Sequence, residues 1–364
     1  MAVTFAARMG LVLVAIGLTV GLARAATLEQ MAGQMILVGF VGTGPADPGV
    51  KAVIADLRAG GVGGVMVLKT NLGSAAKIKA LTGALRTATD GGPPPFIAID
   101  QEGGAVARLG ANTGFPQLPN AETEARTRSV DEARSDYAAM AEGLAQFGFN
   151  LNFAPVLDLK LNPDNPVIAR FGRSFSRDAG VVTDYARALI EAHRLAGVLT
   201  ALKHFPGHGS STADSHEGIA DITATWRETE LAPYRQLINE DMADMVMIGH
   251  LVHFGLDPSG QPASLSGPVI SGLLRDTLGF PGVVISDDLE MGAIRKSHTL
   301  EETVVAAVEA GTDILLFSNT LKPRASLADE VRAILVNEAE ANPDFRARIE
   351  ASYARIMALK DRLK

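Results

Sequence analysis

The chain has 364 residues, 47% hydrophobic and 20% charged, a composition that predicts a folded protein with a large core and excludes an intrinsically disordered one. Its formal charge of −8 argues against nucleic acid as a partner, because phosphate backbones select basic surfaces. Cysteine is absent, so the fold needs no disulfide bonds.

The first 25 residues have the pattern of an export signal. Arg8 precedes an apolar run over residues 10–22, and Ala23-Arg24-Ala25 places small residues at the two positions that a signal peptidase reads. The apolar run is shorter than the ~20 residues that a membrane span needs. We therefore expect cleavage after Ala25, a mature protein without a stable membrane anchor, and a periplasmic or secreted location.

Eight short apolar runs follow, each bounded by turn residues. They are rich in Val, Ile, Leu and Met and lack polar alternation, as is typical of parallel strands that are covered on both faces. The predicted strands are 35–40, 63–68, 96–100, 151–159, 199–205, 245–251, 282–288 and 313–318.

Helical patterns separate these strands. The predicted helices include 131–147, 178–196, 227–241 and 300–310, and two more over 324–364, broken near Asn342-Pro343. Parallel strands need such crossover helices. Eight βα units without a dividing linker predict an α/β fold, a single-domain (β/α)8 barrel over residues 26–364 with additional C-terminal helices. We expect it to be a monomer.

Titratable residues gather where the predicted strands end. Asp100 and Glu102 follow the third strand and Asp158 ends the fourth, whereas Lys203-His204 closes the fifth. His250 lies near the end of the sixth predicted strand, and Asp287-Asp288 end the seventh. In a (β/α)8 barrel the carboxyl ends of the strands carry the active site. The sequence therefore predicts an active site at this rim.

Asp287 and Asp288 come at the end of the seventh predicted strand. A carboxylate there can attack an anomeric carbon or stabilise positive charge, although Asp also serves as a helix N-cap. Neighbouring strand residues point in opposite directions, so we expect the two aspartates to divide these roles.

The segment KHFPGHGSSTADSH, residues 203–216, is predicted to be a loop because Pro206, Gly207 and Gly209 interrupt regular structure. Asp214 can hold the imidazole of His216 and so make its other nitrogen more basic, which suits proton transfer. A different interpretation uses His204, His208, Asp214 and His216 as zinc ligands of a metal-dependent barrel hydrolase.

Basic side chains near the same rim offer hydrogen-bond donors. Arg108, Arg173 and Lys203 can donate to a bound ligand, and Asp100 can accept from its hydroxyl groups. Each of these residues could instead form a structural salt bridge across the barrel mouth.

Five motifs resemble, in order, those of the bacterial β-N-acetylglucosaminidases of glycoside hydrolase family 3. They are DQEGG at 100–104, NFAPVLD at 152–158, GRSF at 172–175, KHFPGHG at 203–209 with DSH at 214–216, and SDDL at 286–289. The resemblance covers roughly residues 28–320, nearly the whole mature chain.

The resemblance implies a retaining glycosidase that needs no cofactor and no metal. It implies that Asp287 is the nucleophile and that His216, assisted by Asp214, is the acid/base. The positions that hold the N-acetylated sugar are then Asp100, Arg108, Arg173, Lys203 and His204. The implied partner is a small-molecule or oligosaccharide substrate containing N-acetylglucosamine. Histidine suits both proton transfers, because its ordinary pKa of ~6.5 lies near neutral pH.

The chain departs from the family pattern in three ways, the third being its export signal, which the cytoplasmic cell-wall recycling enzymes of the group lack. Ala105 stands where the family often has Arg, which removes a donor near the sugar, and residues 217–220 replace an element that often contains proline. Three further interpretations stay open: a substrate-assisted hydrolase in which Asp287 and Asp288 position the acetamido group, a phosphorolytic enzyme, and a non-catalytic sugar-binding protein. An export signal would place the substrate outside the inner membrane, as peptidoglycan or chitin fragments.

Overall fold

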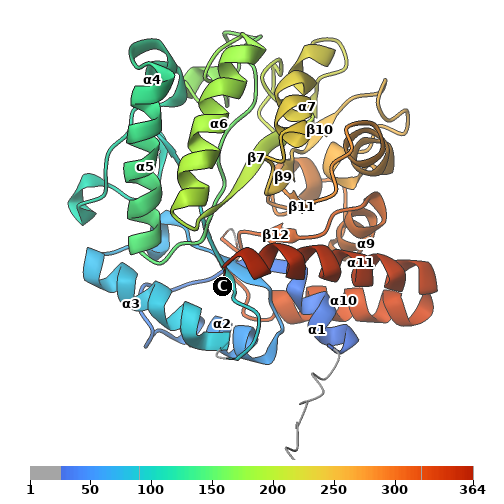
Figure 1. Cartoon of the computed structure of the whole chain (residues 1–364). Helices are drawn as coiled ribbons and strands as arrows, with labels where there is room; N and C mark the ends of the chain where they lie inside the picture. The colour runs from blue at the N-terminus through green and yellow to red at the C-terminus, as the bar shows by residue number, and fades with distance from the viewer. Residues whose placement is uncertain (1–25, 90, 321, 364) are drawn as a thin grey trace, which may run out of the picture.

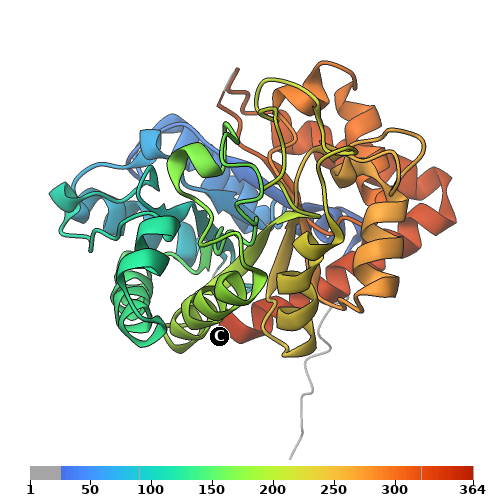
Figure 2. The same ribbon diagram turned by 90° about the horizontal axis from the view of Figure 1, so that it is seen from above.

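Parallel strands form the centre of the molecule, and helices surround them (Figures 1 and 2). The computed structural model describes residues 26–89, 91–320 and 322–363, so the predicted signal over residues 1–25 lies outside the described part of the chain. The eight strands are β1 (Ile36–Gly39), β2 (Gly64–Met66), β3 (Phe96–Ile99), β6 (Leu151–Asn152), β7 (Leu199–Phe205), β9 (Met245–Ile248), β11 (Val283–Ser286) and β12 (Leu315–Phe317).

From β1 to β11, each of these eight strands pairs in parallel with the next of the eight, and β12 pairs with β1. A bridge between Ile285 and Ile314 connects β11 to the start of β12. The backbone N–H groups of Asp313 and Ile314 both donate to the carbonyl of Val284, at 2.9 and 3.0 Å, and thus close the ring. The predicted (β/α)8 barrel is confirmed.

The fourth strand is shorter than predicted. Residues 151–159 were expected to form one strand, but β6 covers only Leu151–Asn152. Pro155 has no N–H to donate to the ladder, and Ala154 donates back to the carbonyl of Asn152 at 2.8 Å. Pairing with β7 resumes at the bridge between Val156 and Lys203. The chain therefore reaches Asp158 at the barrel mouth as an irregular segment.

The helices agree with the periodic stretches of the sequence, and α9 has the predicted bounds. They are α1 (Leu28–Gln34), α2 (Pro48–Ala59), α3 (Ala75–Arg86), α4 (Ala121–Thr127), α5 (Val130–Gln146), α6 (Ala179–Leu195), α7 (Ala232–Asn239), α8 (Gly292–Arg295), α9 (Leu300–Ala310), α10 (Leu327–Ala341) and α11 (Pro343–Lys360). Thr27, Ser129 and Thr299 form capping boxes that fix where α1, α5 and α9 begin. Among the described residues, no helix has the length and apolarity required to cross a bilayer.

Helix α11 lies against α10 and α1 and meets the amino-terminal ends of the strands (Figure 1). Lys360 donates to the carbonyl of Gly63, just before β2, at 2.6 Å. Arg355 contacts Asp313, just before β12, at 3.0 Å, and Arg362, just beyond the helix, contacts Asp244, just before β9, at 2.8 Å. The C-terminal helix thus packs against the end of the barrel opposite the rim where the titratable residues gather.

Candidate active site

A cavity of about 450 Å³ opens at the carboxyl ends of the strands. Met66, Phe153, Met247 and Leu316 supply apolar surface to it. All eight residues predicted as site residues also line it: Asp100, Arg108, Arg173, Lys203, His204, Asp214, His216 and Asp287. Residues from segments more than 180 positions apart therefore share one cavity, as expected for the mouth of a barrel.

Asp287 is placed by the end of β11. Its backbone N–H donates to the carbonyl of Ile248 on β9 at 2.9 Å, which holds the residue in line with the strand. Its carboxylate accepts the N–H of Asp288 at 2.8 Å. Burial alone would raise the pKa of Asp287, but the nearby imidazoles of His204 and His250 and the N–H of Asp288 outweigh it and hold the pKa at about 2. Asp287 is therefore an anion at neutral pH.

Asp288 has a different environment. One of its carboxylate oxygens accepts the N–H of Glu290 at 3.0 Å and the N–H of Ser318 at 2.9 Å, so it joins the end of β11 to the end of β12. Burial raises the pKa of Asp288. Its backbone carbonyl also lies 2.9 Å from Nε2 of His250, a buried side chain. These contacts fix the turn that carries Asp287.

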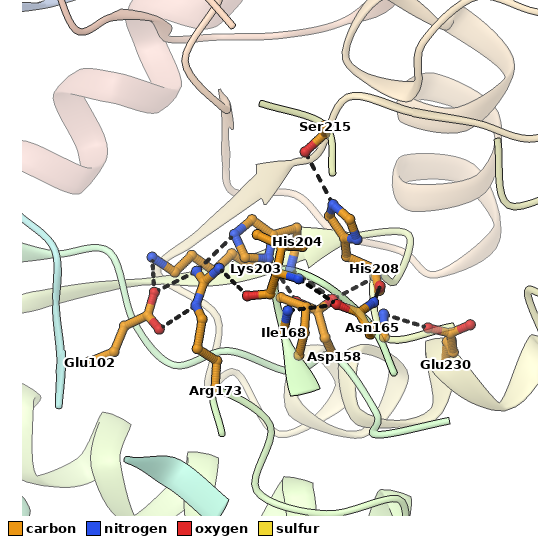
Figure 3. Close-up of polar contacts among 12 residues, drawn as sticks. Glu102, Asp158, Asn165, Ile168, Arg173, Lys203, His204, His208, Ser215 and Glu230 are labelled. Carbon is orange, nitrogen blue, oxygen red and sulfur yellow. Dashed lines mark hydrogen bonds and ion pairs between the residues drawn. The ribbon is translucent and has the colours of Figure 1, made fainter. Parts of the chain in front are cut away.

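A cluster of charged side chains lies at the cavity, and Figure 3 shows the contacts that Glu102 makes in it with Lys203 and Arg173. Lys203 donates to Asp100 at 3.0 Å and to Glu102 at 2.7 Å. Arg173 makes two bonds of 2.8 Å to the oxygens of Glu102, and Arg108 contacts Asp100 at 3.1 Å. Nε of Arg108 is buried and has no hydrogen-bond partner among the described residues. The cluster therefore contains one donor that the described residues leave unsatisfied.

Glu102 and Lys203 of this cluster keep their charges at neutral pH. Burial alone would raise the pKa of Glu102, but Arg173 and Lys203 outweigh it and hold that pKa far below its usual range. Burial would likewise lower the pKa of Lys203, but Glu102 and Asp100 raise it above its ordinary value. Glu102 was placed at the rim by the sequence but was not predicted as a site residue, because its two cationic partners lie far along the chain.

His204 is held by Asp158, the second residue that the sequence placed at the rim without a role. Nδ1 of His204 lies 2.7 Å from one carboxylate oxygen of Asp158, and Nε2 lies 3.5 Å from Arg173 (Figure 3). Burial alone would raise the pKa of Asp158, but His204 and His208 outweigh it and lower the pKa. The carboxylate orients the imidazole of His204, whose other nitrogen faces Arg173 of the charge cluster.

Asp214 and His216 lie on the loop after β7. One oxygen of Asp214 accepts the backbone N–H of His216 at 2.9 Å and lies 2.7 Å from its Nδ1. Burial alone would raise the pKa of Asp214, but the contacts with His216 outweigh it and lower the pKa. The His216 side chain is 61% exposed, and its Nε2 has no hydrogen-bond partner among the described residues. This nitrogen is therefore available for contact with a ligand in the cavity.

The segment after His216, where the chain departs from the family pattern, is anchored to neighbouring elements. Strand β8 (Ala220–Asp221) pairs in parallel with β10 (Leu251–Val252). The N–H of Gly292, at the start of α8, donates to the carbonyl of His216 at 3.2 Å, and Lys296 donates to the carbonyl of Glu217. The loop that carries His216 thus rests on α8, immediately after the turn that carries Asp287 and Asp288.

The remaining histidines do not gather into a metal site. The described residues contain no group of three or more His, Asp or Glu side chains arranged to hold a metal ion. Of the four proposed zinc ligands, His204 is bonded to Asp158, His208 to Ser215, and His216 to Asp214. His193, close in sequence, is buried in α6 against Asn152. This arrangement gives the zinc interpretation no support.

Comparison with known proteins gives a consistent result. The glycosyl hydrolase family 3 N-terminal domain matches residues 27–359. Beta-hexosaminidase A of Pseudoalteromonas piscicida is 34% identical over 322 residues, which make up 83% of this chain and 54% of that protein. Beta-hexosaminidase LpqI of Mycobacterium tuberculosis is 36% identical over 319 residues, 84% of this chain and 76% of that protein.

Two solved structures are similar over nearly the whole chain. A glycoside hydrolase family 3 beta-N-acetylglucosaminidase from Paenibacillus sp. str. FPU-7 has a TM-score of 0.85 at 34% identity and covers 93% of this chain and 63% of its own. A beta-N-acetylhexosaminidase from Beutenbergia cavernae has a TM-score of 0.81 at 32% identity and covers 93% of this chain and 99% of its own. The chain thus spans only part of the Pseudoalteromonas and Paenibacillus proteins.

Proposed function

Because this chain belongs to glycosyl hydrolase family 3, we propose that it removes terminal β-linked N-acetylglucosamine from its substrates with retention of configuration. The observation that carries the proposal is that an ionised carboxylate, Asp287, and an exposed imidazole oriented by a carboxylate, His216 with Asp214, line the same cavity. Relatives named beta-hexosaminidase and beta-N-acetylglucosaminidase support the choice of sugar.

In the first step, Asp287 attacks the anomeric carbon. A bond forms between its carboxylate oxygen and this carbon while the bond to the leaving oxygen breaks. His216, protonated on Nε2, gives this proton to the leaving oxygen, and Asp214 stabilises the imidazolium that donates it. The low pKa of Asp287 supports the proposed role, because the nucleophile must be ionised while the histidine carries a proton.

In the second step, His216 acts as a base. The neutral imidazole takes a proton from water, the water oxygen bonds to the anomeric carbon, and the bond to Asp287 breaks. Asp287 leaves as a carboxylate and His216 is again protonated, so the enzyme returns to its starting state. A neutral imidazole does not repel an anion, so phosphate can compete with water as the acceptor of the sugar in this step.

We propose that the charge cluster holds the sugar. Asp100 can accept from sugar hydroxyls, and Arg108, whose partly exposed guanidinium also lines the cavity, can donate to one. Arg173 and Lys203 are fixed by Glu102 and Asp100, so they can bind a ligand without losing much side-chain entropy. His204, on β7, is the fifth proposed sugar-binding residue.

A panel of aryl glycosides, with and without the 2-acetamido group, tests the activity and the sugar. We expect release of the aglycone from the N-acetylglucosaminide and much slower release from the glucoside. Added phosphate should leave the product unchanged as free sugar, whereas a sugar phosphate would indicate phosphorolysis. Binding of the sugar without release of aglycone would contradict the proposal and favour a sugar-binding protein.

We further propose that the protein is exported by its first 25 residues and acts on peptidoglycan or chitin fragments outside the inner membrane. The sequence of residues 8–25 supports this. Cell fractionation followed by N-terminal sequencing tests it: we expect a mature chain beginning at Ala26 in the periplasm or medium. A full-length chain in the cytoplasm would contradict it.

A further inference from the structure

Asp158 lies at the centre of a buried hydrogen-bond network that joins the sugar side of the cavity to the loop that carries His216 (Figure 3). One carboxylate oxygen contacts Nδ1 of His204 at 2.7 Å. The other accepts the backbone N–H groups of His208 at 2.7 Å and His204 at 3.2 Å. The same carboxylate therefore holds both a proposed sugar-binding residue and the first part of the catalytic loop.

The start of this loop is fixed by two further contacts. The side-chain amide of Asn165 donates to the carbonyls of His208 at 2.8 Å and Ser211 at 3.1 Å. The N–H of Gly209 donates to Glu230, a buried carboxyl, at 3.2 Å. By contrast, the His216 side chain, seven residues further on, is 61% exposed. The backbone of His216 is held on one side by the N–H of Gly292, and a second support can come from a connection to this fixed base.

The ring of His208 makes such a connection. Its Nε2 lies 3.1 Å from the hydroxyl oxygen of Ser215, the residue between Asp214 and His216, and both side chains are buried. Nδ1 of His208 has no hydrogen-bond partner among the described residues. Because a buried N–H without a partner is costly, the proton belongs on Nε2, which donates to Ser215. Burial lowers the pKa of His208 to about 4, so the ring stays neutral near neutral pH.

We propose that His208 is a positioning residue for the acid/base: Asp158 anchors its backbone N–H, and its ring holds Ser215 and thereby the Asp214–His216 pair in the cavity. This inference rests on the proposed function, because it assigns His208 an effect that acts only through His216. His208 touches neither the substrate nor Asp287 in this account.

Two variants break the connection at its two ends, Ser215→Ala and His208→Leu. kcat/KM is measured on aryl N-acetylglucosaminides whose leaving groups range from activated to poor. We expect a loss of about 10- to 100-fold on the poor leaving groups, which depend on the acid, and less than about threefold on the most activated one. Ser215→Thr keeps a hydroxyl and should restore most of the loss. An equal loss on all leaving groups would overturn the inference.

A double-mutant cycle gives the second test. If His208 and Ser215 act through His216, either substitution should change kcat/KM by less than about twofold in a His216→Ala background. The same loss in both backgrounds would indicate a general structural role. His193→Leu is the matched control, because His193 is another buried histidine with a pKa of about 4 and lies away from the cavity. We expect its effect to be independent of the leaving group.

The two proposals can fail separately. If His216→Ala alone shows no dependence on the leaving group, the proposed acid/base fails and this inference falls with it. If His216→Ala shows the dependence but Ser215→Ala behaves as wild type, only the inference fails. Thermal unfolding of each variant shows that it is folded, and Ser215→Ala, which removes a single atom, carries the test if His208→Leu does not fold.

Discussion

At the scale of single residues, His216 should show its double role in one variant. His216→Ala removes the acid of the first step and the base of the second, so we expect a loss of about 10²- to 10⁴-fold on poor leaving groups and a smaller one on activated aryl substrates. Azide needs no base, so adding it should raise kcat on the activated substrates and yield a glycosyl azide. Equal losses on every leaving group, without an effect of azide, would contradict the assignment.

Glu102 should matter more for stability and binding than for chemistry. Glu102→Gln leaves two buried cations, Lys203 and Arg173, with less compensating charge, so we expect the free energy of unfolding to fall by about 3 kcal/mol and KM to rise. The folded-state pKa of Glu102 lies below its unfolded value of ~4.3, so the carboxylate stabilises the fold above about pH 4 and loses this effect as pH falls.

Urea unfolding at pH 7 and pH 3 measures both effects of Glu102→Gln. The difference in stability between wild type and variant should shrink at the lower pH. Glu122→Gln is the control, because the ion pair of Glu122 with Lys160 is partly exposed and should contribute less than about 1 kcal/mol. An equal fall in the free energy of unfolding for Glu102→Gln and Glu122→Gln would contradict the larger contribution expected from the buried ion pairs of Glu102.

At the scale of elements, the contact between α8 and the catalytic loop should control activity. A Cβ atom at Gly292 would lie 2.7 Å from the carbonyl oxygen of His216 and would push the loop away. We expect Gly292→Ala to lower kcat about 10-fold or more with little change in thermal stability, because the loop is at the surface. Gly83→Ala in α3, where the added atom meets nothing within 4 Å, should leave kcat unchanged. Unchanged kcat in Gly292→Ala would contradict this role of α8.

The C-terminal helix should give the protein a measurable dependence of stability on pH. Lys360 of α11 is buried, and burial lowers its pKa to about 7. Its ordinary pKa is ~10.4, so between about pH 7 and 10 the unfolded chain binds a proton that the folded chain lacks. This residue should therefore add about 2–4 kcal/mol of stability as the pH rises from 7 to 9.5. Lys360→Met should remove that rise in urea unfolding, and an identical pH dependence in both proteins would contradict the assignment.

The sequence predicted the positions of the strands well, because each is a continuous apolar run. It did not predict where the fourth strand ends, because that depends on individual backbone hydrogen bonds. The apolar runs marked all eight strands because buried parallel strands lack polar alternation. The fourth strand ended early because Pro155 cannot donate and because the N–H of Ala154 donates to Asn152 instead of to a neighbouring strand. Apolarity alone carries no sign of such a break.

The candidate site could be predicted in outline but not in its contacts. The barrel pattern indicated which rim would carry the chemistry, and the eight predicted site residues line one cavity. The sequence does not predict the partners of Glu102 and Asp158. Lys203 and Arg173 contact Glu102, and His204 contacts Asp158, from segments that are distant in sequence. His208 looked like a zinc ligand in sequence, yet its ring contacts Ser215. Only the structure shows that Nε2 of His208 already has a hydrogen-bond partner.

At the scale of the whole molecule, the barrel separates function from support. The strands' carboxyl ends carry Asp287, His204 and the loop of His216, whereas their amino ends are fixed by α11 through Lys360, Arg355 and Arg362. Substitutions at the amino-terminal end of the barrel should alter the free energy of unfolding without altering KM. The predicted monomer stays a prediction, and sedimentation equilibrium of the mature chain is the measurement that checks it.

The central claim is that Asp287 forms a covalent bond to the sugar, and trapping tests it most directly. A 5-fluoro N-acetylglucosaminyl fluoride slows both steps while its good leaving group keeps the first one accessible, so intact-protein mass spectrometry should show one added sugar. Peptide mapping should place it on Asp287, and Asp287→Asn, with at least a 10⁴-fold loss of activity, should gain none. An adduct on another residue, or rapid turnover of the native substrate without any adduct, would contradict the account and favour participation by the acetamido group.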